Sequence, residues 1–293
     1  MRVTDRSLFE SSIARNGAAR ERHAQATAEA STGIKVQHPW DSSATPLIAR
    51  YRLDADRMRA INGAVGAARG DLDLVDGTLA GIVNVLQRGG ELAVQLANDT
   101  YNATDRASAA AEVRALRDEV VRLANVESAG RYLLSGTAEG TRAFDAAGTY
   151  QGDAGERRIE LAPGSTEVVS FRGDQILGTA NGGIDVLVAL EDLALALEAD
   201  DTAAIRTSID AMHTGVGQVA VAQSKLGGVM LGLEIAETSN RALADVADER
   251  RAELTDADFI EAATNLAFAE RALEASFAAT AKSFGPSLLD VLR

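Results

Sequence analysis

The chain has 293 residues and a formal net charge of −14, from 43 acidic and 29 basic side chains. This charge argues against binding dominated by nucleic-acid phosphates and against attraction to anionic membranes. The chain has no cysteine, which excludes disulfides, thiolate metal sites and thiol nucleophiles. The N-terminus lacks the apolar core of a signal peptide, and no run of about 18 apolar residues occurs. We therefore expect neither a cleaved signal peptide nor a membrane span.

Apolar residues make up 46% of the chain but aromatic residues only 4%. A composition dominated by Ala, Leu and Val is typical of long helices packed in thin layers. We therefore expect a mainly α fold, an elongated helical bundle or coiled coil of N- and C-terminal helices that carries a small inserted β-rich domain.

The strongest pattern predicts a long helix that begins near residues 42–45 and continues to about residue 96. Hydroxyl groups can cap its start, and Pro46 can occupy its first turn. Apolar residues then recur in alternating steps of three and four, as in a coiled coil. These positions are Met58, Ile61, Val65, Ala68, Leu72, Val75, Leu79, Ile82 and Leu86.

Three further helices follow from the same periodicity. One should begin after "NATDR", with Thr104 as its cap, and run to about Ser128. A shorter one spans residues 184–197, and a long one covers residues 205–250. The two long helices can pair in antiparallel orientation.

The segment 136–183 differs in composition from these helices. Gly and Asp clusters separate "RRIEL" and "TEVVSF", which have strand character. We expect a small antiparallel β insertion. "YQGDAGERR" within it lacks the Lys-Ser/Thr of a P-loop and the ligand series of an EF-hand, so a hairpin turn is the better interpretation.

The last predicted helix begins at Thr255 or Asp256 and has an unusual aromatic content. Four of the seven phenylalanines lie in residues 259–293. Phe268 lies opposite the main stripe, which predicts that the helix is covered on more than one side. Gly285-Pro286 can end or kink it. The main stripe consists of Phe259, Ala263, Leu266, Glu270, Leu273, Phe277, Ala281, Phe284 and Leu288.

No catalytic or metal-binding pattern emerges. His23, His38 and His213 lie in separate segments without ligand spacing, and no nucleophile motif is present. We expect no enzyme activity, no metal and no cofactor. The glycine pairs Gly66/Gly70, Gly77/Gly81 and Gly228/Gly232 indicate close helix contact, either within the bundle or between subunits of an assembly.

Several motifs resemble the flagellin superfamily and, within it, the proteins that join hook to filament. "STGIKVQHPWDSSA" is similar to the family's loop after its first helix, through Ser31, Gly33, Lys35, Val36, Pro39 and Asp41. "GRYLLSGTAEGTRAF", "YQGDAGERRIELAPGSTEVV", "DADFIEAATNL" and "SLLDVL" resemble later family segments in the same order. The chain departs at Ser42-Ser43, Leu134 and Val291.

The resemblance implies a structural protein of the bacterial flagellum, exported to the cell exterior without a cleaved signal, that assembles into a ring or helical layer. It implies contacts with its own copies, hook-associated protein 1, flagellin and an export chaperone, and none with nucleic acid or membrane. The implied divisions are an N-terminal polymerisation helix and loop (1–45), helical core halves (46–135 and 184–254), the insertion (136–183) and a C-terminal polymerisation helix (255–293).

We expect the terminal helices to form the assembly surface. Its candidate residues are Phe9, Ile13, Phe259, Leu266, Phe268, Leu273, Phe277, Phe284, Leu288, Leu289 and Leu292. Two alternatives stay open at this point, a short filament-forming flagellin and a freestanding helical binding module or enzyme.

Overall fold

The protein is described by a computed structural model that covers residues 2–36 and 42–284. The chain forms two compact units. One comprises Arg57–Leu243, and the other combines Met1–Asp56 with Ala244–Arg293. Two long helices, α2 (Thr45–Leu96) and α6 (Thr202–Thr255), contribute residues to both units.

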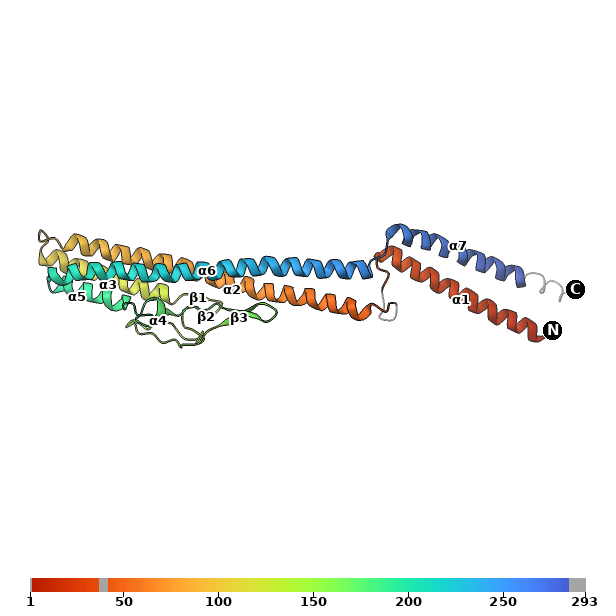
Figure 1. Ribbon diagram of the computed structural model, residues 1–293, viewed down its shortest axis with the longest axis horizontal. Helices are drawn as coiled ribbons and strands as arrows, with labels where there is room; N and C mark the ends of the chain where they lie inside the picture. Colours follow the sequence, from red (N-terminus) through yellow and green to blue (C-terminus); the bar gives the residue numbers. More distant parts are fainter. Residues whose placement is uncertain (1, 37–41, 285–293) are drawn as a thin grey trace. The chain divides into compact units, whose positions relative to one another are not determined.

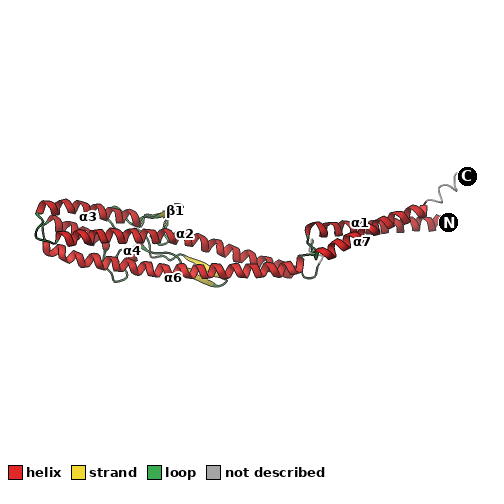
Figure 2. Ribbon diagram, turned by 90° about the horizontal axis from the view of Figure 1, so that it is seen from above, coloured by secondary structure: helices red, strands yellow, loops and turns green. Residues whose placement is uncertain are grey.

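The unit 57–243 is a bundle in which α2 and α6 lie side by side with α3 (Ala103–Ala124) and α5 (Val186–Glu198) (Figures 1 and 2). The amide of Asn62, early in α2, donates a hydrogen bond of 3.1 Å to the carbonyl of Glu237, late in α6, whereas Gly89, late in α2, lies against Met212, early in α6. The predicted antiparallel pairing of the two long helices is therefore confirmed. The predicted α2 positions form its core face, with Leu72, Leu79, Ile82 and Leu86 fully buried.

The start and end of α3 differ from the prediction. Its cap is Asn102, whose side-chain oxygen accepts a hydrogen bond of 2.9 Å from the Asp105 amide, so Thr104 lies inside the helix. The helix ends at Ala124 rather than near Ser128. Ala129 and Gly130 have positive φ angles and turn the chain between β1 (Glu127–Ser128) and β2 (Arg131–Tyr132), a pair that the sequence pattern missed.

The predicted β insertion is present. β3 (Arg158–Ala162) pairs in antiparallel register with β4 (Ser165–Val168). Gly164 has φ +81° in the connecting turn, a conformation that glycine adopts without the steric cost of a Cβ. A single turn of helix, α4 (Gly173–Ile176), follows before α5. The overall fold class is mainly α, as predicted.

In the other unit, α1 (Arg2–Thr32) and α7 (Phe259–Phe284) lie side by side (Figures 1 and 2). The Asp258 carboxylate accepts a hydrogen bond of 2.8 Å from the Ile260 amide, so Asp258 caps α7. The predicted start at Thr255 or Asp256 was wrong, because Thr255 is the last residue of α6. The backbone of Gly33 accepts from the Ala257 amide at 2.8 Å and connects the ends of α1 and α7.

Candidate assembly surface

The contact between α1 and α7 uses small and polar side chains. The Asn16 amide donates a hydrogen bond of 3.1 Å to the Thr280 hydroxyl, and the Ser276 hydroxyl donates to the Asn16 carbonyl oxygen. The least exposed positions recur at helical spacing on each helix. On α1 these include Ser12, Asn16, Ala19, His23, Ala26 and Ala30, and on α7 they include Ala262, Leu266, Ala269, Leu273, Ser276 and Thr280.

The bulky apolar side chains of α7 point elsewhere. Phe259 and Ile260 are each 76% exposed, and Phe268 is 64% exposed. They line a shallow groove of about 440 Å³ together with Ala263, Thr264, Ala267 and Arg271. At about 100° per residue, Phe268 lies roughly 120–140° around the helix from Ala262 and Leu273, on the side turned away from α1. The helix therefore presents an uncovered apolar surface on its outer side.

The predicted main stripe of α7 is only partly the face that meets α1. Leu266 and Leu273 lie on that face, whereas Phe259, Ala263 and Glu270 are exposed. The prediction followed the largest side chains. The contact instead follows small ones, because α1 itself offers mostly alanine and hydroxyl groups there.

Of the remaining candidate residues, some lie on α1 and α7 and the others lie outside the described residues. Phe9 and Ile13 on α1 are 52% and 56% exposed, and Phe277 on α7 is 41% exposed. The Arg20 guanidinium lies 5.2 Å from the centre of the Phe277 ring, a cation–π contact between the two helices. Phe284 is the last residue of α7. Leu288, Leu289, Leu292 and Gly285-Pro286 lie outside the described residues, as do His38, Pro39 and Asp41 from the earlier predictions.

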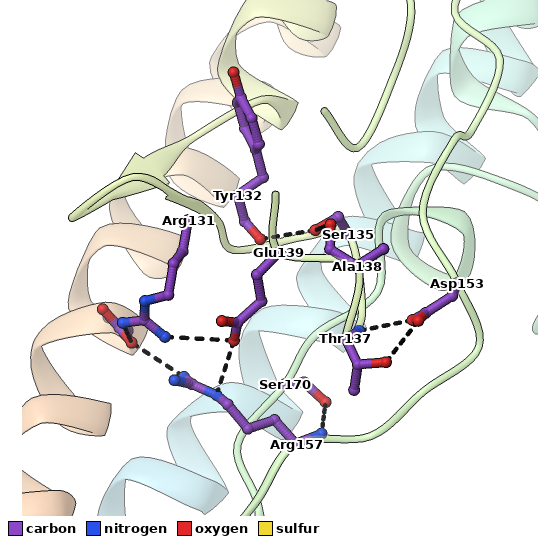
Figure 3. Close-up of polar contacts among 10 residues, drawn as sticks. Arg131, Tyr132, Ser135, Thr137, Ala138, Glu139, Asp153, Arg157 and Ser170 are labelled. Carbon is purple, nitrogen blue, oxygen red and sulfur yellow. Dashed lines mark hydrogen bonds and ion pairs between the residues drawn. The ribbon is translucent and has the colours of Figure 1, made fainter. Parts of the chain in front are cut away.

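A nearly buried carboxylate on α2 holds two arginines, Arg131 on β2 and Arg157 in the insertion. Asp71 is 5% exposed and accepts hydrogen bonds from Arg131 at 2.9 Å and from Arg157 at 3.0 Å. Burial raises the pKa of Asp71, but hydrogen bonds from Ser128, Arg157 and Arg131 outweigh that effect, and its pKa lies below the ordinary value. Glu139 contacts both arginines, at 3.4 and 3.8 Å (Figure 3).

A second carboxylate closes the loops of the same insertion. Asp153 accepts hydrogen bonds from the Thr137 amide at 2.6 Å and from the Thr137 hydroxyl at 2.5 Å (Figure 3). It also accepts one from the Gly155 amide at 3.0 Å. The Thr137 contacts lower the pKa of Asp153. "YQGDAGERR" is therefore an irregular segment that Asp153 ties to the loop at Thr137, and the hairpin turn lies later, at residues 163–164 between β3 and β4. The predicted hairpin turn was placed too early in the chain.

Five of the six paired glycines lie in open space within one subunit. A Cβ added at Gly66, Gly70, Gly77, Gly228 or Gly232 would meet no atom within 4 Å. Only at Gly81 would it approach a neighbouring helix, at 3.2 Å from Leu123. Close packing within the bundle therefore explains Gly81. For the other five glycines, contact between subunits is the remaining interpretation.

Other kinds of site have little support. Among residues 2–36 and 42–284, no group of three or more His, Asp or Glu side chains is arranged to hold a metal ion. Within the described part of the chain, one helix, α6, contains an 18-residue window that is apolar enough for a membrane span by length and composition. A single such helix is weak support for a span, and α6 also supplies Met212, Leu226 and Leu233 to the bundle core.

Comparison with known proteins finds similar flagellar sequences. The model of the bacterial flagellin N-terminal helical region matches residues 9–139. Flagellar hook-associated protein 3 of Escherichia coli K12 is 26% identical over 290 residues, covering 89% of this chain and 90% of that protein. Flagellin C of Vibrio cholerae serotype O1 is 30% identical over 173 residues, covering 55% of this chain and 45% of that protein.

The fold has solved counterparts. The crystal structure of flagellar hook-associated protein 3 from Legionella pneumophila superposes with a TM-score of 0.63 at 17% identity, covering 71% of this chain and all but 2% of that one. The flagellin region, the similarity over nearly the whole length and the shared fold agree with the motifs in the insertion. The chain is therefore similar to proteins of the flagellin superfamily and, over nearly its whole length, to flagellar hook-associated protein 3.

Proposed function

We propose that this chain is a structural subunit of the bacterial flagellum that forms the junction between the hook-associated ring and the filament by self-assembly. The observation that carries this proposal is the arrangement of α1 and α7. The two helices bury small and polar groups between them and leave Phe259, Ile260 and Phe268 exposed on α7. An apolar surface of this kind marks an interaction site.

The inferred mechanism is the packing of terminal helices from identical subunits. The groove on the outer face of α7 is covered by neighbouring subunits, with Phe268 as the anchor of the contact. Phe9, Ile13, Leu266, Leu273, Phe277, Phe284, Leu288, Leu289 and Leu292 belong to the same proposed layer of residues 1–45 and 255–293. Heterologous contacts between copies generate a ring or helical array, which suits a junction between two tubular structures.

The proposed partners are hook-associated protein 1 on one side and flagellin on the other. Before assembly, an export chaperone covers the apolar face of α7. Amphipathic helices commonly bind in this way, with the apolar face in a hydrophobic groove of the partner. The chain leaves the cell without cleavage of a signal peptide. No enzymatic step is needed, since the family is one of structural flagellar proteins.

A filament-forming flagellin is the second candidate. The similarity to flagellin C spans 45% of that protein, whereas the similarity to hook-associated protein 3 spans 90% of its counterpart. The matching lengths favour the junction role.

Deletion of the gene tests the junction role, together with complementation by variants of Phe268. We expect cells without the protein to build hooks, release flagellin into the medium and lose motility. Wild type and Phe268→Leu should restore attached filaments. Phe268→Glu should not, because it places a charge in a contact from which assembly excludes water. Filaments attached to hooks in the deletion strain would overturn the proposal.

A further inference from the structure

A second uncovered apolar surface runs along α6 in the unit 57–243. Val221, Leu231 and Ile235 are 70%, 59% and 62% exposed. With the exposed residues Ser224 and Gly228 they form what we call the α6 stripe, which carries no charge. The opposite side of α6 supplies Leu226 and Leu233 to the core. A helix that is apolar on two sides needs a partner beyond its own bundle.

A complementary surface of small side chains runs along α2. Gly63, Ala67, Gly70, Leu74 and Gly77 are exposed and form what we call the α2 stripe. A Cβ added at any of the three glycines would meet no atom within 4 Å. Glycine is unfavourable inside a helix, and nothing within the subunit uses the space that these glycines leave.

The two stripes point in opposite directions. α2 and α6 turn their core residues toward each other, and Arg69 on α2 forms ion pairs with Glu234 and Glu237 of α6 at 3.8 and 3.7 Å. Each stripe lies on the far side of its helix. A subunit with matching surfaces on opposite sides associates head to tail, which produces a ring or a helical array.

The spacing and size of the residues match. The α2 stripe advances in steps of four, three, four and three residues, and the α6 stripe shows the same steps when read backwards. An antiparallel alignment can therefore set Val221, Leu231 and Ile235 against glycine or alanine, and Leu74 against Ser224. A shift by one heptad would set Leu74 against Leu231 or move Leu231 and Ile235 beyond the α2 stripe, so only one register matches along the whole length. Neighbouring subunits of equal orientation bring α6 of one copy antiparallel to α2 of the next.

The net charge of the chain and the area of the stripes indicate that a second copy covers them only within the assembly. Two copies of a chain with net charge −14 repel each other, and this repulsion is smallest where neither surface carries a charge. Fifteen residues of helix are about 21 Å long and about 10 Å wide, which gives roughly 200 Å² on each stripe. Stable interfaces bury about 1,200 Å² or more in total, so this contact is too small to hold a dimer alone.

We propose that the α6 stripe of one copy docks antiparallel on the α2 stripe of a second copy in the assembled structure. The inference rests on the proposed function, because it names the partner surface in the same self-assembly. The contact adds to that of α1 and α7 and keeps each bundle in line with its neighbour. In dilute solution both stripes stay exposed.

Cysteine cross-linking in flagella isolated from the producing bacterium tests this pairing, because the natural chain contains no cysteine. Gly70→Cys places a thiol on the α2 stripe, and Val221→Cys and Ile235→Cys place one on the α6 stripe. Ala111→Cys, on the exposed side of α3, is the control. A short bis-maleimide should yield a cross-linked dimer when Gly70→Cys is co-expressed with an α6 variant. Each variant alone, and the control mixtures, should yield none.

Three outcomes would overturn the inference. These are dimers formed by one variant alone, cross-links to a different protein, and lack of any cross-link while both variants are present at the hook end. Immunogold labelling of the same flagella separates the two proposals. Label away from the hook end would defeat the proposed function, whereas label at the hook end without the expected dimer would defeat only the pairing of the stripes.

A steric variant gives a second measurement that does not depend on cross-linker reach. Gly70→Trp should fold normally as a monomer, because its site is open, but its incorporation into the flagellum should fall at least tenfold. Gly140→Trp is the matched control, since Gly140 also has open space and lies in the insertion. Normal incorporation of Gly70→Trp would contradict the pairing.

Discussion

Asp71 on α2 accepts a hydrogen bond of 2.9 Å from Arg131, which lies 60 positions later in the chain. The same carboxylate oxygen also accepts from Arg157. Strand β2 and the insertion thus bring two cations to one nearly buried anion, alongside the contacts of Arg57 with Glu160 and of Asn240 with the carbonyl of Leu161.

Replacement of Asp71 by Asn should loosen the insertion. Removal of this charge leaves Arg131 and Arg157 with only the longer contacts to Glu139, and we expect the free energy of unfolding to fall by about 1–3 kcal/mol. Hydrogen exchange should accelerate in residues 127–169 more than in the helices of the same unit. Asp73→Asn, an exposed neighbour, is the control and should leave both measurements unchanged.

Acid should release the insertion. The pKa values of Asp71 and Asp153 are both lowered in the folded protein. A lowered folded pKa contributes stability that is present above the unfolded value, about 3.9, and is lost as pH falls through the folded pKa. A pH titration followed by NMR should show the insertion signals change below about pH 4 while α2 and α6 remain helical. Equal loss of insertion and helix signals would contradict this account.

Replacement by alanine should destabilise the protein at Gly136 but not at Gly140. Gly136 has φ +75°, and a Cβ there would lie 2.3 Å from the Asp153 carboxylate. The left-handed conformation alone costs roughly 1–2 kcal/mol for a residue with a Cβ, and the clash adds to it. Gly140 has open space, so Gly140→Ala should change stability by less than about 0.5 kcal/mol. Urea unfolding of both variants measures the difference.

Phe277→Asp should block assembly without unfolding the bundle. Phe277 belongs to the unit of α1 and α7, where Arg20 covers its ring, so the unit 57–243 should retain its thermal unfolding. The new carboxylate would be buried in the proposed inner layer, which is costly for an unpaired charge. Motility and filament attachment are the readouts, with Phe277→Leu as the apolar control. Attached filaments of normal number in Phe277→Asp would argue against the layer.

The sequence predicted the helices well because their core positions repeat at a regular spacing. Val65, Leu72 and Leu79 are buried where the pattern puts them. Helix ends were less certain, since Asn102 and Thr104 can both supply a capping oxygen and only the backbone conformation selects Asn102. The pair β1–β2 has two residues in each strand, too few for any period to emerge.

The candidate site was harder to predict than the fold. The outer position of Phe268 followed from its angle on the helix. The face of α7 that meets α1 did not, because its small residues, such as Ala262 and Ser276, give no hydrophobic signal. The Asp71 contact joins positions 60 and 86 residues apart, and the available hint was a charged residue next to the core position Leu72.

Immunogold labelling of intact flagella with an antibody against this chain tests the junction role most directly. The account predicts a localised band of gold at the end of the hook, where the filament begins. Gold distributed along the filament would contradict it and would identify the chain as a filament subunit instead.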